Sequence, residues 1–131
     1  MAETVEAKFT IDSWDEQQFD EVPDTSKLTR ASVTKSYSGG VEGTSTTEWL
    51  MSYADDGSAT FVGLERIVGT VGGRKGSLVL QHVGAYAGGT ATANLSVVEG
   101  SGSDDLARVA GTGKFTADPA GSLSLRLEPR A

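Results

Sequence analysis

Apolar and polar residues alternate with a period of two along most of the chain, which is the pattern of strands that bury one face. Gly-rich and Asp-Gly segments interrupt this alternation and have the composition of tight turns. A helical repeat is hard to find, so the pattern predicts an all-β protein. The eight predicted strands cover residues 4–14, 28–37, 41–54, 58–71, 74–86, 90–99, 107–116 and 122–128.

A row of antiparallel strands leaves two exposed edges unless the sheet closes on itself. We therefore expect an eight-stranded antiparallel up-and-down β-barrel with a lipocalin-like architecture. The length of 131 residues suits a single domain, so residues 1–131 are assigned to one barrel.

Short turns at residues 56–57, 72–73 and 87–88 set the expected register of the neighbouring strands. The opposite pairs that they predict are Met51 with Phe61, Trp49 with Gly63, Glu65 with Leu80, Gly63 with His82, and His82 with Ala93.

One face of these strands collects most of the large apolar residues and is interpreted as the barrel interior. Besides the pairs above it contains Val5, Phe9, Ile11, Tyr53, Ile67, Leu78, Leu95, Val97, Val109, Phe115, Leu123, Leu125 and Leu127. The opposite face is mostly polar, but it also carries Val62, Leu64, Val79 and Val83. These outward residues suggest a homo-oligomer interface.

Glu65 and His82 are polar residues on the predicted interior face. They occupy diagonal positions on adjacent strands, about 7 to 8 Å apart in standard ladder geometry, which long side chains can bridge. Two interpretations stay open. The pair is either an internal hydrogen bond that fixes the barrel register, or a catalytic acid–base pair that contacts a ligand.

Small inward residues, including Gly63, Gly84 and Ala93, are expected to leave volume for a pocket inside the barrel. The candidate substrate-binding residues are Trp49, Tyr53, Phe61, Leu80 and Phe115. Trp14 is expected to cover one barrel mouth or to stack on a ligand.

Composition excludes several functional classes. The chain has no Cys and one His, so thiolate chemistry, iron–sulfur clusters and two-His metal sites are not available within one chain. No metal or cofactor is expected. The net charge of -7 disfavours nucleic acid and anionic membranes. No apolar run is long enough to span a bilayer and the start of the chain is acidic, so we expect a cytoplasmic protein. The acidic stretch 12–24 is interpreted as a solvated connector.

Four segments carry a resemblance to a known family. They are residues 37–43 (YSGGVEG), 61–69 (FVGLERIVG), 76–84 (GSLVLQHVG) and 97–102 (VVEGSG), the last followed by Asp105 and Leu106. The chain resembles a small bacterial family known as a domain of unknown function, whose fold is the allene-oxide-cyclase-like barrel. The wider fold includes cyclases that hold an apolar substrate inside the barrel. The Cys of the plant cyclase pocket has no counterpart here.

Three functions are therefore considered. The first is a cofactor-free isomerase, cyclase or lyase of a small hydrophobic molecule, with Glu65 and His82 as catalytic groups. The second is a barrel that binds a small apolar ligand without chemistry. The third is a filled structural barrel that acts through an oligomer surface.

Overall fold

A computed structural model describes residues 2–118 and 120–129, and it is built from antiparallel β-strands. The strands are β1 (Glu3–Val22), β2 (Ser26–Gly39), β3 (Val41–Ala54), β4 (Ala59–Val71), β5 (Arg74–Ala87), β6 (Thr90–Val97), β7 (Ser103–Asp104), β8 (Val109–Ala117) and β9 (Gly121–Pro129). The all-β prediction is confirmed. In this described part of the chain, no helix is long and apolar enough to cross a membrane.

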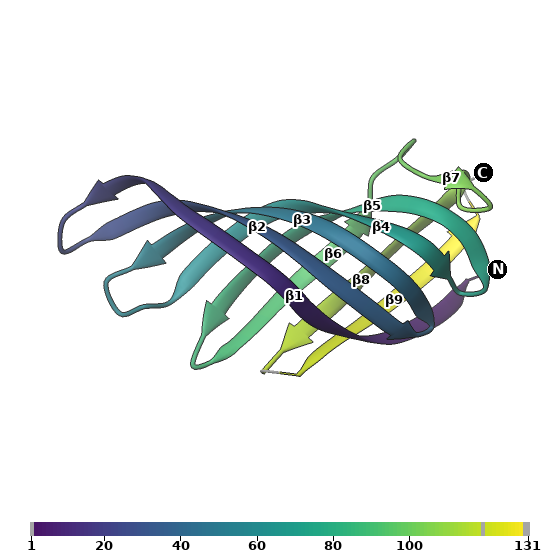
Figure 1. Ribbon diagram of the computed structural model, residues 1–131, viewed down its shortest axis with the longest axis horizontal. Coiled ribbons are helices and arrows are strands. Elements are labelled where there is room, and N and C mark those ends of the chain that lie inside the picture. Colours follow the sequence, from purple (N-terminus) through teal and green to yellow (C-terminus); the bar gives the residue numbers. More distant parts are fainter. Residues whose placement is uncertain (1, 119, 130–131) are drawn as a thin grey trace.

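The sheet closes on itself in a ring (Figure 1). Each long strand pairs antiparallel with the next along the chain, and β1 returns to pair with β9 over residues 3–9. The short β7 adds to the end of β5 at Gly76 and Ser77. The predicted up-and-down architecture of eight long strands is thus confirmed, and ring closure gives each of them a neighbouring strand on both sides over at least part of its length.

Most predicted pairs are also present. Trp49 lies opposite Gly63, and Glu65 lies opposite Leu80. The pairing of His82 with Ala93 was wrong, since His82 faces Leu95. The turn between β5 and β6 uses Gly88 and Gly89, which both have positive φ, whereas an earlier turn would force Ala87 into that conformation. The shift is two residues, so the inward face stays inward.

The first strand is longer than predicted. β1 runs to Val22, so most of the acidic stretch 12–24, which was interpreted as a connector, is a strand that pairs with β2, and Asp24 lies in the turn. Irregularities in the register occur between Ile11 and Ser13 and between Gln18 and Asp20, and each accommodates one extra residue of β1. The resulting β1–β2 hairpin reaches far beyond the β8–β9 turn (Figure 1). Ile11 is therefore 45% exposed and does not join the core.

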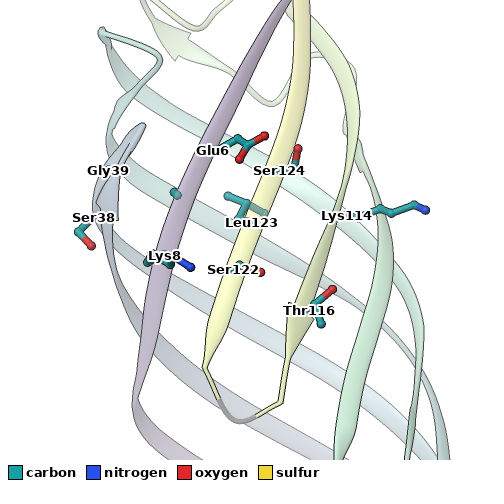
Figure 2. Close-up of a pocket in the computed structure, with 10 residues that line it drawn as sticks. Glu6, Lys8, Ser38, Gly39, Lys114, Thr116, Ser122, Leu123 and Ser124 are labelled. Carbon is teal, nitrogen blue, oxygen red and sulfur yellow. The ribbon is translucent and has the colours of Figure 1, made fainter.

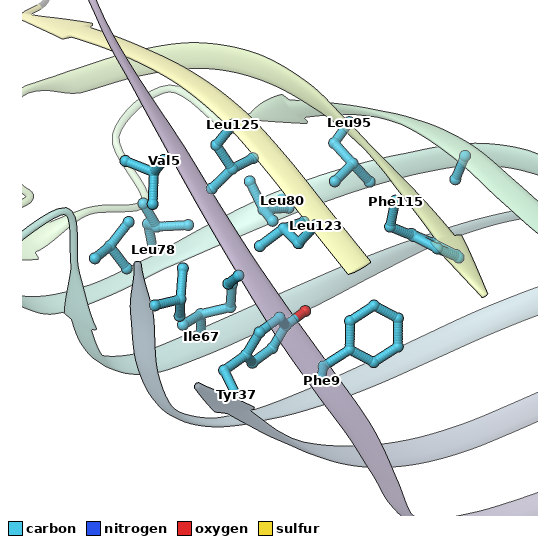
Figure 3. Close-up of a cluster of buried hydrophobic side chains, with 14 of the residues drawn as sticks. Val5, Phe9, Tyr37, Ile67, Leu78, Leu80, Leu95, Phe115, Leu123 and Leu125 are labelled. Carbon is cyan, nitrogen blue, oxygen red and sulfur yellow. The ribbon is translucent and has the colours of Figure 1, made fainter. Parts of the chain in front are cut away.

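The interior is divided along its length. Aliphatic side chains such as Ile67, Leu78 and Leu125 fill one end, while Phe9 and Phe115 lie toward the other (Figure 3). The inward glycines Gly63 and Gly84 do not leave empty volume inside the ring, because large side chains pack against them. A Cβ at Gly63 would lie 2.5 Å from Cδ1 of Trp49, so this glycine makes room for an indole.

The outward face matches its prediction in part. Val62, Leu64 and Val83 are exposed, and Val79 is half-buried. The association of copies through this face stays a prediction.

Candidate functional site

The carboxylate of Glu65 is the centre of a polar cluster inside the ring. Its Oε2 accepts hydrogen bonds from the Tyr37 hydroxyl and the Ser45 hydroxyl, each at 2.6 Å. Its Oε1 lies 2.9 Å from Nε2 of His82 and 3.5 Å from Nζ of Lys35. Glu65 and His82 are 0% exposed. The carboxylate therefore has donors from β2, β3 and β5 around it.

The predicted contact between Glu65 and His82 is present, but the other members of the cluster were not predicted from the sequence. Lys35 and Tyr37 share the inward face of β2 with Ala31 and Val33. Ser45 shares the inward face of β3 with Trp49. The alternation of Ala31, Val33 and Tyr37 was the available signal, and a lysine within it looked like an ordinary surface residue.

Lys35 is 1% exposed and is surrounded by aromatic rings. Its ammonium lies 4.6 Å from the ring centre of Phe9, 5.0 Å from that of Phe115 and 5.1 Å from that of Trp49. Cation–π attraction and the Glu65 carboxylate compensate part of the desolvation of this charge. The lysine thus connects the polar cluster to an aromatic layer.

The electrostatics follow from burial and these contacts. Burial raises the pKa of Glu65, but Lys35, His82 and Ser45 outweigh it and lower that pKa to about 2. Burial lowers the pKa of Lys35, although Glu65 opposes the shift. Burial and Glu65 together raise the pKa of Tyr37, which stays a hydrogen-bond donor. The carboxylate is therefore ionised at neutral pH.

His82 is neutral, and its tautomer is fixed. The indole N–H of Trp49 donates to Nδ1 of His82 at 3.1 Å. An indole nitrogen only donates, so Nδ1 is unprotonated and the ring proton sits on Nε2, where it is donated to Glu65. Burial and the Lys35 charge lower the pKa of His82, while Glu65 raises it, and the net direction is downward.

A cavity of about 490 Å³ opens at the end of the ring that carries the β3–β4, β5–β6 and β8–β9 turns. Of the two Trp, three Tyr and four Phe residues in the chain, all except Phe19 and Tyr37 line it. The lining residues are Phe9, Ile11, Trp14, Trp49, Met51, Tyr53, Phe61, Tyr86, Gly89, Ala91, Phe115 and Ala117. The polar cluster lies behind the rings of this lining.

Four of the five predicted binding residues line the cavity, and one does not. Trp49, Tyr53, Phe61 and Phe115 line the cavity. Leu80 does not, because it is fully buried in the aliphatic core. The Trp14 ring lies 5.5 Å from the Trp49 ring, and both line the cavity. A catalytic role for Glu65 and His82 stays a prediction, since neither lines the cavity.

A carboxylate also lies at the mouth of the cavity. Glu16 accepts a hydrogen bond from Nε1 of Trp14 at 3.0 Å and one from the Thr29 hydroxyl at 2.6 Å. Burial raises its pKa, but these bonds, Tyr53 and Lys27 lower it overall. Burial and Glu16 in turn raise the pKa of Tyr53 to about 12. Glu16 thus links Trp14 of β1 to Thr29 of β2 at the mouth.

A smaller depression of about 300 Å³ lies on the outer side of β1, β8, β9 and the end of β2 (Figure 2). Its side chains include Glu6, Lys8 and Lys114, and Lys114 points away from the others in Figure 2. Among the described residues, no group of three His, Cys, Asp or Glu side chains is placed to hold a metal ion. The aromatic cavity is therefore the main candidate site.

The fold and site place the chain among proteins with a closed antiparallel sheet. The chain belongs to the DUF3224 family, whose model, described as "Protein of unknown function (DUF3224)", matches residues 5–128. The chain is also similar to a crystal structure of a protein of unknown function from this family in Shewanella oneidensis MR-1. The two are 26% identical, with a TM-score of 0.79 and all of both chains covered. No curated protein matches.

The buried ion pair generates a stability prediction. Glu65→Gln leaves the Lys35 charge without its counterion, so the free energy of unfolding in urea should fall by about 3–5 kcal/mol. Adding Lys35→Met should recover part of this loss. The exposed pair of Arg30 and Glu48 provides the control, since Glu48→Gln should cost less than about 1 kcal/mol. Additive effects of the two buried substitutions would contradict the coupling.

The single histidine permits an unambiguous NMR test. The pKa of His82 should lie below the unfolded value of about 6.5, so the unfolded state binds more protons and stability should fall as the pH drops through that value. Trp49→Phe removes the N–H that blocks Nδ1 and should raise the pKa of His82, whereas Trp14→Phe should not. A charged imidazole at pH 7 in the wild type would rule this tautomer assignment out.

Proposed function

We propose that the protein binds a small, neutral, apolar molecule with a ring system in the aromatic cavity. The observation that carries this proposal is the concentration of the chain's aromatic side chains around one opening. The volume of about 490 Å³ is in the range of small-molecule sites. Aromatic walls favour stacked and edge-on contacts with a flat ligand.

The charges near the cavity favour a neutral ligand. Lys35 lies behind the floor rings Phe9, Trp49 and Phe115, and its charge disfavours a cation in the cavity. Glu65 neutralises that charge at 3.5 Å, so no net attraction for an anion is left. The chain as a whole carries -7 and repels anions at long range.

The polar cluster supports the cavity from below. His82 holds the Trp49 indole by a hydrogen bond, and Lys35 contacts three of the floor rings. A floor whose rings are already fixed loses little conformational entropy when a ligand binds. In this proposal Glu65 and His82 act by positioning the pocket. A cytoplasmic location stays a prediction.

Binding can be measured with N-phenyl-1-naphthylamine, a neutral apolar fluorophore. Its emission should rise on addition of the protein, and Ala91→Trp should weaken binding at least about ten-fold because the new ring fills the cavity. Ala85→Trp, on the exposed outer side of β5, is the matched control and should bind as the wild type does. Equal binding by both variants would place the probe elsewhere and contradict the proposal.

Isomerisation or cyclisation of the bound molecule is a second candidate function. The hydrogen-bonded chain from Trp49 through His82 to Glu65 favours it. A substrate that displaces the Trp49 indole meets Nδ1 of His82, which can take a proton, and Glu65 then balances the imidazolium charge. This reaction needs no cofactor, because the same proton returns to the product.

Turnover distinguishes the two candidates. A molecule retained by the protein is incubated with it and analysed by chiral liquid chromatography and mass spectrometry. The catalytic proposal expects a product of equal mass, with turnover reduced at least about 100-fold in folded His82→Gln and unchanged in Glu48→Gln. Recovery of the unaltered molecule after prolonged incubation would refute catalysis and leave binding intact.

A further inference from the structure

The long strand β1 has a free edge next to the cavity. Its pairing with β9 ends where Phe9 faces Gly121, while its pairing with β2 continues to Val22. Among the described residues, no strand pairs with residues 10–22 on the side that β9 vacates. Figure 1 shows this part of β1 extending beyond the β8–β9 turn. Unpaired backbone N–H and C=O groups on such an edge can accept another strand.

The free edge runs along the cavity mouth. Ile11 and Trp14 belong to this segment, line the cavity, and are 45% and 44% exposed. Trp14 faces the inward Val33 across the ladder, and Glu16 faces the inward Ala31. Side chains alternate along a strand, so every second side chain of an added strand would lie on the cavity side.

The regular part of this edge is short. The register with β2 is uninterrupted over residues 13–18 and is irregular at both ends of that stretch. An added strand can therefore keep a regular ladder over about six residues.

The edge of β1 is acidic, which favours a basic partner strand. Between Lys8 and Lys27 the sequence has no Lys or Arg. The same segment contains Asp12, Asp15, Glu16, Asp20, Glu21 and Asp24. A second copy of this edge would bring carboxylates against carboxylates, which is unfavourable for directly opposed strands. A strand with basic side chains on its outer face would instead complement Asp15 and Asp20, which share the outward face of β1 with Gln17.

We propose that the free edge of β1 binds an extended segment of a partner protein as an added antiparallel strand. The segment alternates basic residues, which face outward beside Asp15 and Asp20, with apolar residues that enter the aromatic cavity. Main-chain hydrogen bonds give such complexes affinity, and the pockets for alternate side chains give them specificity. This inference rests on the cavity of the proposed function, with a peptide side chain as an occupant.

The probe is an acetylated, amidated heptapeptide, Lys-Val-Lys-Phe-Lys-Val-Lys, and binding is measured by calorimetry at low salt. We expect binding, with amide hydrogen exchange slowed at least about ten-fold for those N–H groups of residues 13–18 that face the free edge. A fully backbone-N-methylated version and a version with Glu in place of Lys should not bind. The double variant Asp15→Lys/Asp20→Lys should bind at least about ten-fold more weakly. Its matched control, Glu42→Lys/Asp105→Lys, has the same net charge, lies at the opposite end of the ring and should change affinity less than about two-fold.

Four results would overturn the inference. Equal binding of the N-methylated peptide would mean that no strand is added. Equal weakening in both double variants would mean that only overall charge attracts the peptide. Absence of peptide binding, while N-phenyl-1-naphthylamine still enters the cavity, would remove the edge site and leave the proposed function standing. Failure of both probes would remove the cavity as well.

Discussion

An ionised carboxylate inside a closed sheet has to find its hydrogen-bond donors within the protein, and Glu65 meets this requirement with side chains from neighbouring strands. Tyr37 and Lys35 come from β2, Ser45 from β3, and His82 from β5. A shift of one residue in any of these ladders would turn a donor to the outer face. The registers of four consecutive strands and the charge of one buried residue are therefore mutually dependent.

This constraint organises the interior into layers. On one side of the cluster, aliphatic side chains fill one end of the ring and pack against one another. Above it, Lys35 and His82 contact the rings of Phe9, Phe115 and Trp49. These rings form the floor of the cavity, so contacts with the polar layer hold the rings of the binding surface in place. The long β1–β2 hairpin then extends one wall, and with it Trp14, beyond the ring.

The sequence was informative where local chemistry determines geometry. The Gly72-Gly73 turn fixed the β4–β5 register, and this register predicted the contact of Glu65 with His82. Local chemistry was ambiguous at the β5–β6 turn, where Gly88 and its neighbours allowed two placements. The extension of β1 was missed because its carboxylates look like a solvated loop, although its partner, the first half of β2, follows directly after the turn at residues 23–25. Lys35 was missed because only tertiary contacts reveal why a lysine lies inside.

The central claim is that a fixed aromatic floor separates the ligand from the buried cluster, and a crystal structure with N-phenyl-1-naphthylamine tests it most directly. We expect density for the probe among Trp14, Tyr53 and Phe61, with Glu65 still bonded to Tyr37 and Ser45 at about 2.6 Å. Density for the probe against the Glu65 carboxylate, with Lys35 or Trp49 displaced, would contradict this claim and indicate that the polar cluster itself is the binding site.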